Sequence, residues 1–334
     1  MKAVTGFLAP ARTCADYRDW LVASPAWMLR RPENAKRGRI LKPGDLPDFF
    51  FFHSKASTMF QIPRRTALAA FVLSLAACSS APTGTAQNPP LTSARIAEIV
   101  SSPDRSEADR RADPRRKPQE VLAFIGVRPG MVALDLSAAG GYTTELIARA
   151  VGPTGTVYGQ SPPRPPVSSA AQPESGAASR PPGTGPRPSP VALAERARNP
   201  NASNIVAVVQ PFENPAPAAV ASSGLDLVTM MFDYHDFGHL KVDRAAMNRA
   251  VFAALKPGGL YVLADHAGRP GTGISESGTL HRIEQSFLVA EVEKAGFRYV
   301  GEGTFLRNPA DPKDRNQPEP PQPKDQFIVK FVKP

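Results

Sequence analysis

Cysteine is almost absent from this sequence of 334 residues, which contains only Cys14 and Cys78. Because no cysteine follows Cys78, the longer part of the chain cannot form a disulfide. This excludes a small scaffold held together by disulfides, so a hydrophobic core must stabilise the fold. The roughly 240 residues beyond position 91 are enough to build such a core.

The N-terminal third also lacks an apolar run long enough to cross a bilayer, which takes about 20 residues. Residues 66–75 form a shorter apolar run that follows Arg64 and Arg65 and leads into Leu75-Ala76-Ala77-Cys78. This order is typical of a bacterial export signal that ends in a lipobox. We expect residues 59–78 to be a lipoprotein-type signal peptide, with Cys78 carrying the lipid. The protein would then be exported and held at the periplasmic or envelope membrane by that anchor. The alternative is a short apolar helix with a chance cysteine in a cytoplasmic protein.

Residues 1–58 have no sustained hydrophobic period, and we expect them to be an extension upstream of the true start. The formal charge of +10 depends on these early residues, since 12 of the 40 Lys and Arg residues precede Cys78, against 5 of the 30 Asp and Glu residues. What remains carries a net charge of only +3. The composition therefore does not predict a nucleic-acid partner.

Beyond the polar stretch at residues 79–91, which we expect to be a flexible tether, apolar strand-like segments alternate with helical ones. Helices are predicted in two pieces within 92–125, broken at Ser102-Pro103 and again at Pro114 and Pro118, and then over 142–151, 191–198, 243–255 and 279–295. Strands are predicted at 132–136, 156–159, 204–210, 225–232, 260–264, 298–306 and 327–332. Residues 161–190 include 10 prolines and are predicted to be a disordered insertion. The alternation predicts one domain over 92–334 with a mainly parallel sheet covered on both faces.

The first strand, turn and helix of this domain have the pattern of a ligand-binding unit. Asp135 closes the strand, small residues fill the turn at 137–141, and the helix begins at Tyr142. Small residues let backbone N–H groups approach a ligand, and the N-terminus of the helix adds a positive dipole end. The unit predicts a crevice for a nucleotide-like ligand.

With a Leu255-Lys256-Pro257-Gly258-Gly259 turn and a closing hairpin, the order of elements resembles the class I methyltransferases that use S-adenosylmethionine. The likeness is closest to a bacterial group of predicted, often exported methyltransferases. It is carried by the residues at 232–236 (FDYHD), 241–259, 265–273, 280–283 and 305–309. The resemblance implies a Rossmann-like seven-stranded α/β sheet with a C-terminal antiparallel hairpin. It also implies S-adenosylmethionine as cofactor and a small molecule as methyl acceptor. The alternative is an envelope lipoprotein that keeps this scaffold as a ligand-binding or non-catalytic module.

The resemblance implies a set of cofactor-binding residues, namely Asp135, Ser137, Ala139, Gly140, Gly141, Tyr142, Gln160, Phe212, Phe232 and Asp233. Two departures from the family pattern stand out. The family's Gly-x-Gly-x-Gly positions hold Ser137, Ala139 and Gly141, and side chains at the first two disfavour positive φ. Gln160 replaces the acid that accepts both ribose hydroxyls, and the lost charge is expected to cost about 1–2 kcal/mol of affinity.

Four residues that follow the fourth and fifth strands are the catalytic candidates: His235, Asp236, His266 and His281. The carboxyl ends of parallel strands meet at one edge of a sheet, and an imidazole beside carboxylates can act as a general base. We expect His281 and Arg282 in the first turn of the helix over 279–295, where the arginine would hold an anionic acceptor. The alternative for these polar residues is helix capping and internal hydrogen bonding.

A metal site is a second interpretation of the same edge. Asp233, Asp236, Asp265 and His266 resemble the divalent-cation site of catechol-type O-methyltransferases. There the metal holds two substrate oxygens and lowers their pKa.

Overall fold

The computed structural model describes residues 88–163 and 189–334. The predicted extension, the signal peptide, Cys78, most of the tether and residues 164–188 of the predicted insertion lie outside the described residues. Among the residues that the structure describes, no helix combines the length and the apolar character needed to cross a membrane.

A single sheet of seven strands organises the domain. Its order is β3-β2-β1-β4-β5-β7-β6, and β7 runs antiparallel to both of its neighbours while the other pairs are parallel. The strands are β1 (Val132–Leu136), β2 (Thr156–Ser161), β3 (Ile205–Val209), β4 (Leu225–Met231), β5 (Leu255–His266), β6 (Arg298–Gly303) and β7 (Gln326–Val332). This order confirms the predicted Rossmann-like seven-stranded fold with its antiparallel C-terminal hairpin.

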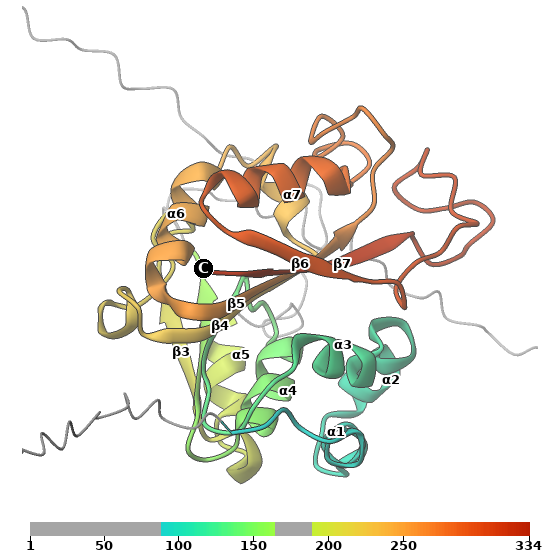
Figure 1. Cartoon of the computed structure of the whole chain (residues 1–334). Coiled ribbons are helices and arrows are strands. Elements are labelled where there is room, and N and C mark those ends of the chain that lie inside the picture. Colours follow the sequence, from blue (N-terminus) through green and yellow to red (C-terminus); the bar gives the residue numbers. More distant parts are fainter. Residues whose placement is uncertain (1–87, 164–188) are drawn as a thin grey trace, which may run out of the picture. The chain divides into compact units, whose positions relative to one another are not determined.

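Helices cover the sheet on both sides, as Figure 1 shows. The helices are α1 (Ser93–Ser101), α2 (Glu107–Arg116), α3 (Pro118–Ile125), α4 (Tyr142–Val151), α5 (Ser189–Arg196), α6 (Arg244–Ala254) and α7 (Gln285–Lys294). Side chains of α1, α3, α4 and α5 pack in one buried cluster with residues such as Ala133 and Val262. Those of α6 and α7 pack in a second cluster with Leu134 and Leu263. Adjacent residues of one strand thus enter opposite clusters, as the alternation of side chains along a strand requires.

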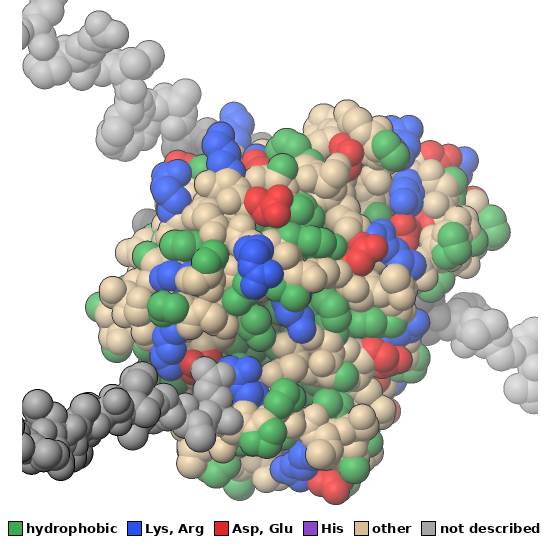
Figure 2. All heavy atoms as spheres, in the orientation of Figure 1, with side chains coloured by type: hydrophobic (Ala, Val, Ile, Leu, Met, Phe, Trp, Pro, Cys, Tyr) green, Lys and Arg blue, Asp and Glu red, His purple; other side chains and the backbone are tan. Residues whose placement is uncertain are grey.

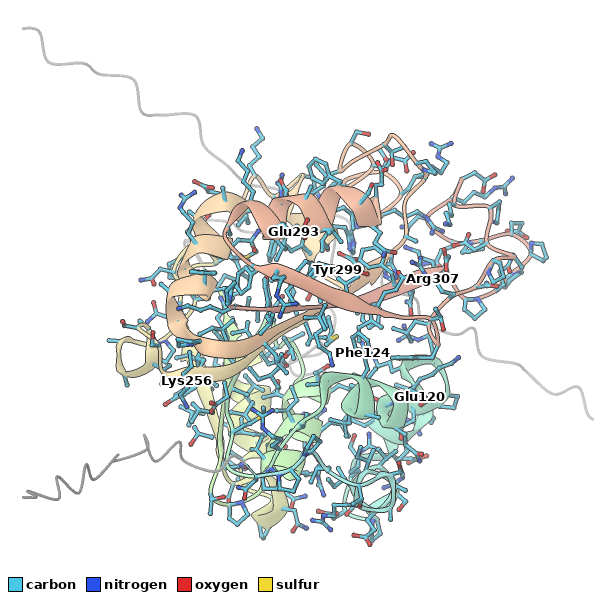
Figure 3. All side chains as sticks on the ribbon, in the orientation of Figure 1. Glu120, Phe124, Lys256, Glu293, Tyr299 and Arg307 are labelled. Carbon is cyan, nitrogen blue, oxygen red and sulfur yellow. The ribbon has the colours of Figure 1, made fainter. Side chains whose placement is uncertain are left out.

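Polar and ionic contacts fasten the N-terminal helices to the face formed by α4 and α5. Arg196 on α5 forms ion pairs with Asp109 on α2 and Glu145 on α4, while Arg149 on α4 pairs with Asp104. On the same side of the sheet, Phe124 of α3 lies beneath β7 (Figure 3), with the Lys330 ammonium 4.7 Å from its ring centroid. On the surface, basic and acidic side chains are interspersed with apolar ones over the face in Figure 2.

Several predicted boundaries are wrong. The region 92–125 forms three helices, and Pro114 lies inside α2 instead of breaking it. The strand predicted at 260–264 begins earlier, at Leu255, because that residue pairs with Leu225 across a register shift. The last helix begins at Gln285 and not at 279, since Ile283 forms a β-bridge with Ala267 and its N–H bonds to the His266 carbonyl at 3.0 Å.

Leu193 of α5 packs directly on Gly159 of β2 and on Gly141, which precedes α4. A Cβ atom added to Gly159 on β2 would lie 2.7 Å from Leu193 Cδ1, and one on Gly141 would lie 2.8 Å from Leu193 Cδ2. Leu193 is itself fully buried. The close approach of α5 to the sheet therefore requires glycine at both positions.

This contact predicts a non-additive pair of substitutions. Gly159→Ala should lower the free energy of unfolding by about 1–3 kcal/mol through overpacking, and Leu193→Ala by about 2–5 kcal/mol through the cavity it leaves. The double variant should lose clearly less than the sum, because each change relieves the other. Urea unfolding of the four proteins measures the coupling, and additive losses would contradict the packing described.

Candidate active site

The turn from β1 to α4 holds three residues in the left-handed region. Ser137 has φ 53°, Ala139 φ 46° and Gly141 φ 80°. The two side chains at glycine positions therefore do not prevent the backbone conformation, contrary to what their disfavoured φ suggested. Gly140, between them, has no atom within 4 Å of the place where a Cβ would lie, so the turn is open to a ligand at this residue.

Gln160 does not lie where a ribose could readily reach it. It is fully buried, its Oε1 accepts from the Ser137 N–H at 3.0 Å, and its Nε2 donates to the Gln210 carbonyl at 2.7 Å. Both ends of the amide thus have protein partners. Gln160 thus stabilises the turn through these bonds, and neither end of its amide is available for the predicted role of ribose partner in this structure.

Asp135, the penultimate residue of β1, is almost completely buried. Its two oxygens accept from the hydroxyls of Thr144 on α4, at 2.6 Å, and Thr229 on β4, at 2.7 Å. Burial raises the pKa of Asp135 to about 6, although both hydroxyls favour its charged form. The carboxylate ties β1 to the helix and to the neighbouring strand.

His235 and Asp265 form the centre of a cluster at the carboxyl ends of β4 and β5. The His235 Nδ1 lies 2.6 Å from Asp265 Oδ1, and the His235 backbone N–H donates to Asp265 Oδ2 at 2.7 Å. Burial disfavours the charged imidazole, but the carboxylates of Asp265 and Asp236 outweigh it and raise the pKa of His235 to about 10. The two carboxylates therefore favour the imidazolium form of His235, which does not suit the predicted role of proton acceptor.

Asp236 brings the imidazoles together. Its Oδ1 lies 3.0 Å from His235 Nε2, 2.8 Å from His281 Nδ1 and 3.8 Å from His239 Nδ1. Burial raises the pKa of Asp236, but the hydrogen bonds from His235 and His281 outweigh that effect and hold it well below its usual value. The structure thus places three of the four predicted catalytic residues, His235, Asp236 and His281, in direct contact.

His266, the fourth, lies at the end of β5 beside them. Its ring stacks on Phe232, with 5.5 Å between centroids, and lies 5.4 Å from the ring of His235. Its Nδ1 is 3.2 Å from Gln326 Nε2, and burial lowers its pKa well below the usual value. Burial thus favours the neutral form of the His266 imidazole.

Asp233 joins the turn to the histidine cluster. Because β1 and β4 pair in parallel, with Leu136 beside Met230, the turn that begins at Ser137 lies next to the residues that follow β4. Ser137 and the charges of His235, Asp236 and Asp265 all influence the pKa of the Asp233 carboxyl group. Burial raises the pKa of Asp233 to about 7. The turn after β1 and the polar residues after β4 and β5 are therefore parts of one site.

Three predicted residues have surroundings other than those expected. Phe212, expected near a nucleoside, packs its ring on Phe237 at 4.4 Å between centroids, and Tyr142 donates from its hydroxyl to Asp113 at 2.7 Å. Arg282 is completely buried and forms two hydrogen bonds with Asp311. The expectation that Arg282 holds an anionic acceptor is therefore wrong.

Sequence reasoning missed His239 and Ser277. The Ser277 hydroxyl donates to the His235 carbonyl and lies 3.0 Å from His239 Nδ1. His239 follows His235 by four residues, a spacing that a helical turn brings onto one face, so this signal was available. Ser277 has no comparable signal. Four of the five histidines in the sequence consequently meet at this edge of the sheet.

The residues of the predicted metal set do not assemble as expected. Among the residues described, the group with donor atoms close enough to share an ion is His235, Asp236 and His281, all within 4.8 Å of one another. Asp265 instead contacts His235, and the His266 Nδ1 is bonded to Gln326. Only Asp236 of the predicted four belongs to the group.

No protein-family model and no curated protein matches this sequence. Solved structures with a similar arrangement include a SAM-dependent methyltransferase from Aquifex aeolicus. It is 15% identical over 73% of this chain and 100% of its own, with a TM-score of 0.45. An arsenic(III) S-adenosylmethionine methyltransferase from Chlamydomonas reinhardtii is 16% identical over 73% of this chain and 74% of its own, with a TM-score of 0.44. Fibrillarin from Aeropyrum pernix with bound S-adenosylmethionine is 17% identical over 62% and 68%, with a TM-score of 0.38. Likeness at this level carries no conclusion about activity.

The raised pKa of Asp135 predicts a pH-dependent stability. Because the folded pKa of about 6 exceeds the unfolded value, the folded state binds more protons between about pH 4 and pH 6, and its stability falls as the pH rises through that window. Asp135→Asn removes this contribution. The free energy of unfolding of the natural protein, relative to the variant, should fall by up to about 2–3 kcal/mol from pH 4 to 6.5. Urea titrations across this range measure it, and a constant difference would contradict the burial of a titrating Asp135.

The positive φ of Ala139 predicts that glycine is better tolerated there than alanine. The left-handed conformation costs a non-glycine residue about 1–2 kcal/mol, so Ala139→Gly should raise the free energy of unfolding by about 0.5–1 kcal/mol after the added entropy of the unfolded chain. Ala253→Gly, at an exposed position of α6, is the matched control and should lose up to about 1 kcal/mol. Thermal unfolding distinguishes the two, and equal losses would show that the turn does not hold this strain.

Proposed function

We propose that this protein is a methyltransferase that uses S-adenosylmethionine and acts on a small molecule at the carboxyl edge of β1, β4 and β5. The observation that carries the proposal is the parallel pairing of β1 with β4, in which Leu136 lies beside Met230. This pairing places the turn after β1 next to the histidine cluster after β4, so a cofactor bound at the turn would lie beside the imidazoles and carboxylates of the cluster. The strand order with an antiparallel β7 is the one that the sequence resemblance implies.

The turn residues fit the amino-acid end of such a cofactor. Gly140 leaves room for close backbone approach, and α4 starts with Tyr142 directly behind the turn, so its N-terminal dipole favours a carboxylate there. At the ribose end the fit is poorer, because the family's acid is missing and Gln160 is bonded within the protein. Binding would therefore depend mainly on the turn and on the aromatic ring of Phe232.

When bound, S-adenosylmethionine supplies an electrophilic methyl group. The task of the chain is then to hold the acceptor in line with that group and to exclude water, and positioning of this kind provides a large share of the acceleration in such transfers. The buried cluster around His235 and Asp265 is rigidly hydrogen-bonded and lies next to the turn. It is suited to orient a polar acceptor and to donate or receive hydrogen bonds.

Calorimetric titration of the full-length protein with S-adenosylmethionine tests the proposal. The natural protein should bind with micromolar affinity, and Gly140→Ala should weaken binding at least tenfold with an unchanged melting temperature, since the added Cβ has no protein atom within 4 Å. Ala245→Val, at an exposed position of α6, is the control and should bind as the natural protein does. Absence of both heat and a thermal shift in the natural protein would overturn the proposal and favour a scaffold that no longer transfers methyl groups.

A further inference from the structure

His235 lies between two carboxylates, and each of its ring nitrogens faces one of them. Nδ1 is 2.6 Å from Asp265 Oδ1, and Nε2 is 3.0 Å from Asp236 Oδ1. A neutral imidazole has one N–H and one lone pair. If Nδ1 donates to Asp265, the lone pair of Nε2 points at the negatively charged oxygen of Asp236. The arrangement therefore needs a cation between Nε2 and Asp236, either a proton or a metal ion.

A third donor reaches the same place from a distant part of the chain. His281 Nδ1 lies 2.8 Å from the Asp236 Oδ1 that faces His235. Ligand atoms around a tetrahedral zinc ion, with bonds of about 2.0–2.1 Å, lie about 3.3 Å apart. The two ring nitrogens lie 3.0 and 2.8 Å from Asp236 Oδ1, which is close to that value. Small side-chain shifts that lengthen these separations would make room for an ion between the three residues.

We propose that His235 Nε2, the Asp236 carboxylate and a ring nitrogen of His281 bind one divalent transition-metal ion. Two imidazoles and a carboxylate are the donors that zinc and its neighbours in the first transition row prefer, whereas magnesium and calcium prefer oxygen alone. Three protein ligands leave at least one position for water or for an oxygen of a bound molecule. On binding, the ion displaces the proton from Nε2.

The surroundings are built as metal sites are. Asp265 is completely buried and accepts from the His235 ring, which is the carboxylate–histidine pair that fixes the orientation of a metal-binding imidazole. An ion has a path to the site, since the side chains of Asp236 and His281 are 20% and 23% exposed while that of His235 is 4% exposed. His239 lies beside the group but is not part of it, because its Nδ1 is hydrogen-bonded to the Ser277 hydroxyl.

Cobalt(II) is a suitable probe, because its visible absorption reports the number and kind of ligands. The metal-free full-length protein should bind one equivalent of Co²⁺, and Zn²⁺ should displace the bound Co²⁺.

Substitutions of the proposed ligands test the assignment. Asp236→Asn and His281→Asn should each weaken Co²⁺ binding at least a hundredfold. Asparagine is chosen at position 281 because it tolerates the φ of 50° found there. Asp265→Asn should weaken binding 10–100-fold, as is typical when a metal-binding histidine loses its carboxylate partner. His239→Gln is the matched histidine control and should retain the affinity within about threefold.

These measurements are made without S-adenosylmethionine, so they stand or fall independently of methyl transfer. Folding of every variant is checked by circular dichroism. Binding that is lost in His239→Gln but kept in His281→Asn would overturn the assignment. So would a natural protein that binds no Co²⁺ and whose His235 shows two ring N–H signals by NMR, because a proton would then be the cation between the carboxylates.

Discussion

The carboxylate of Asp265 is the group on which the arrangement of the site depends. It is completely buried near the end of β5 and accepts hydrogen bonds from three N–H groups: the backbone and ring of His235 and the backbone of His266. A buried carboxylate without such donors would cost several kcal/mol. The same bonds hold the segment after β4 against the end of β5. These three hydrogen bonds therefore both stabilise the buried charge of Asp265 and fix the position of His235.

From His235 the arrangement extends outward in two directions. Through Asp236 it reaches His281, and through Asp233 it reaches Ser137 in the first turn. Four of the eight non-glycine residues with positive φ in the described part of the chain lie along this path. Ser137, Ala139, Phe232 and His281 all have positive φ without being glycine, and each such residue costs of order 1 kcal/mol. Strain that persists at four positions around one site, where the contacts hold it in place, is typical of functional sites.

Much of the fold could be predicted from the sequence because its elements are strongly patterned. The bounds of β1 and α4 were predicted as they are found, since an apolar strand, a turn of small residues and an amphipathic helix follow one another without ambiguity. The start of α7 was missed, because residues 279–284 have helix-compatible residues but are held by a bridge to Ala267. Local pattern carries no information about such a long-range pairing.

In the site, the sequence indicated which residue types gather at the edge of the sheet but not which of them meet. Parallel topology placed the residues after β4 and β5 together, so the contact of His235 with Asp265 was foreseeable. The burial of Gln160 was not, because its partners, the Ser137 N–H and the Gln210 carbonyl, are backbone groups whose position depends on the folded turn. Such backbone partners have no signature in side-chain chemistry.

The position of His281 depends on a residue that was assigned a different role. Arg282 is completely buried and donates to Asp311 and to the carbonyls of Ala267 and Arg315. These bonds, with the bridge between Ile283 and Ala267, hold residues 281–283 beside the end of β5. His281 is thereby turned toward Asp236, 45 residues earlier in the chain. The buried ion pair of Arg282 with Asp311 thus determines whether His281 reaches the site. Its role in positioning His281 depends on the folded structure and could not be predicted from the charge of the arginine alone.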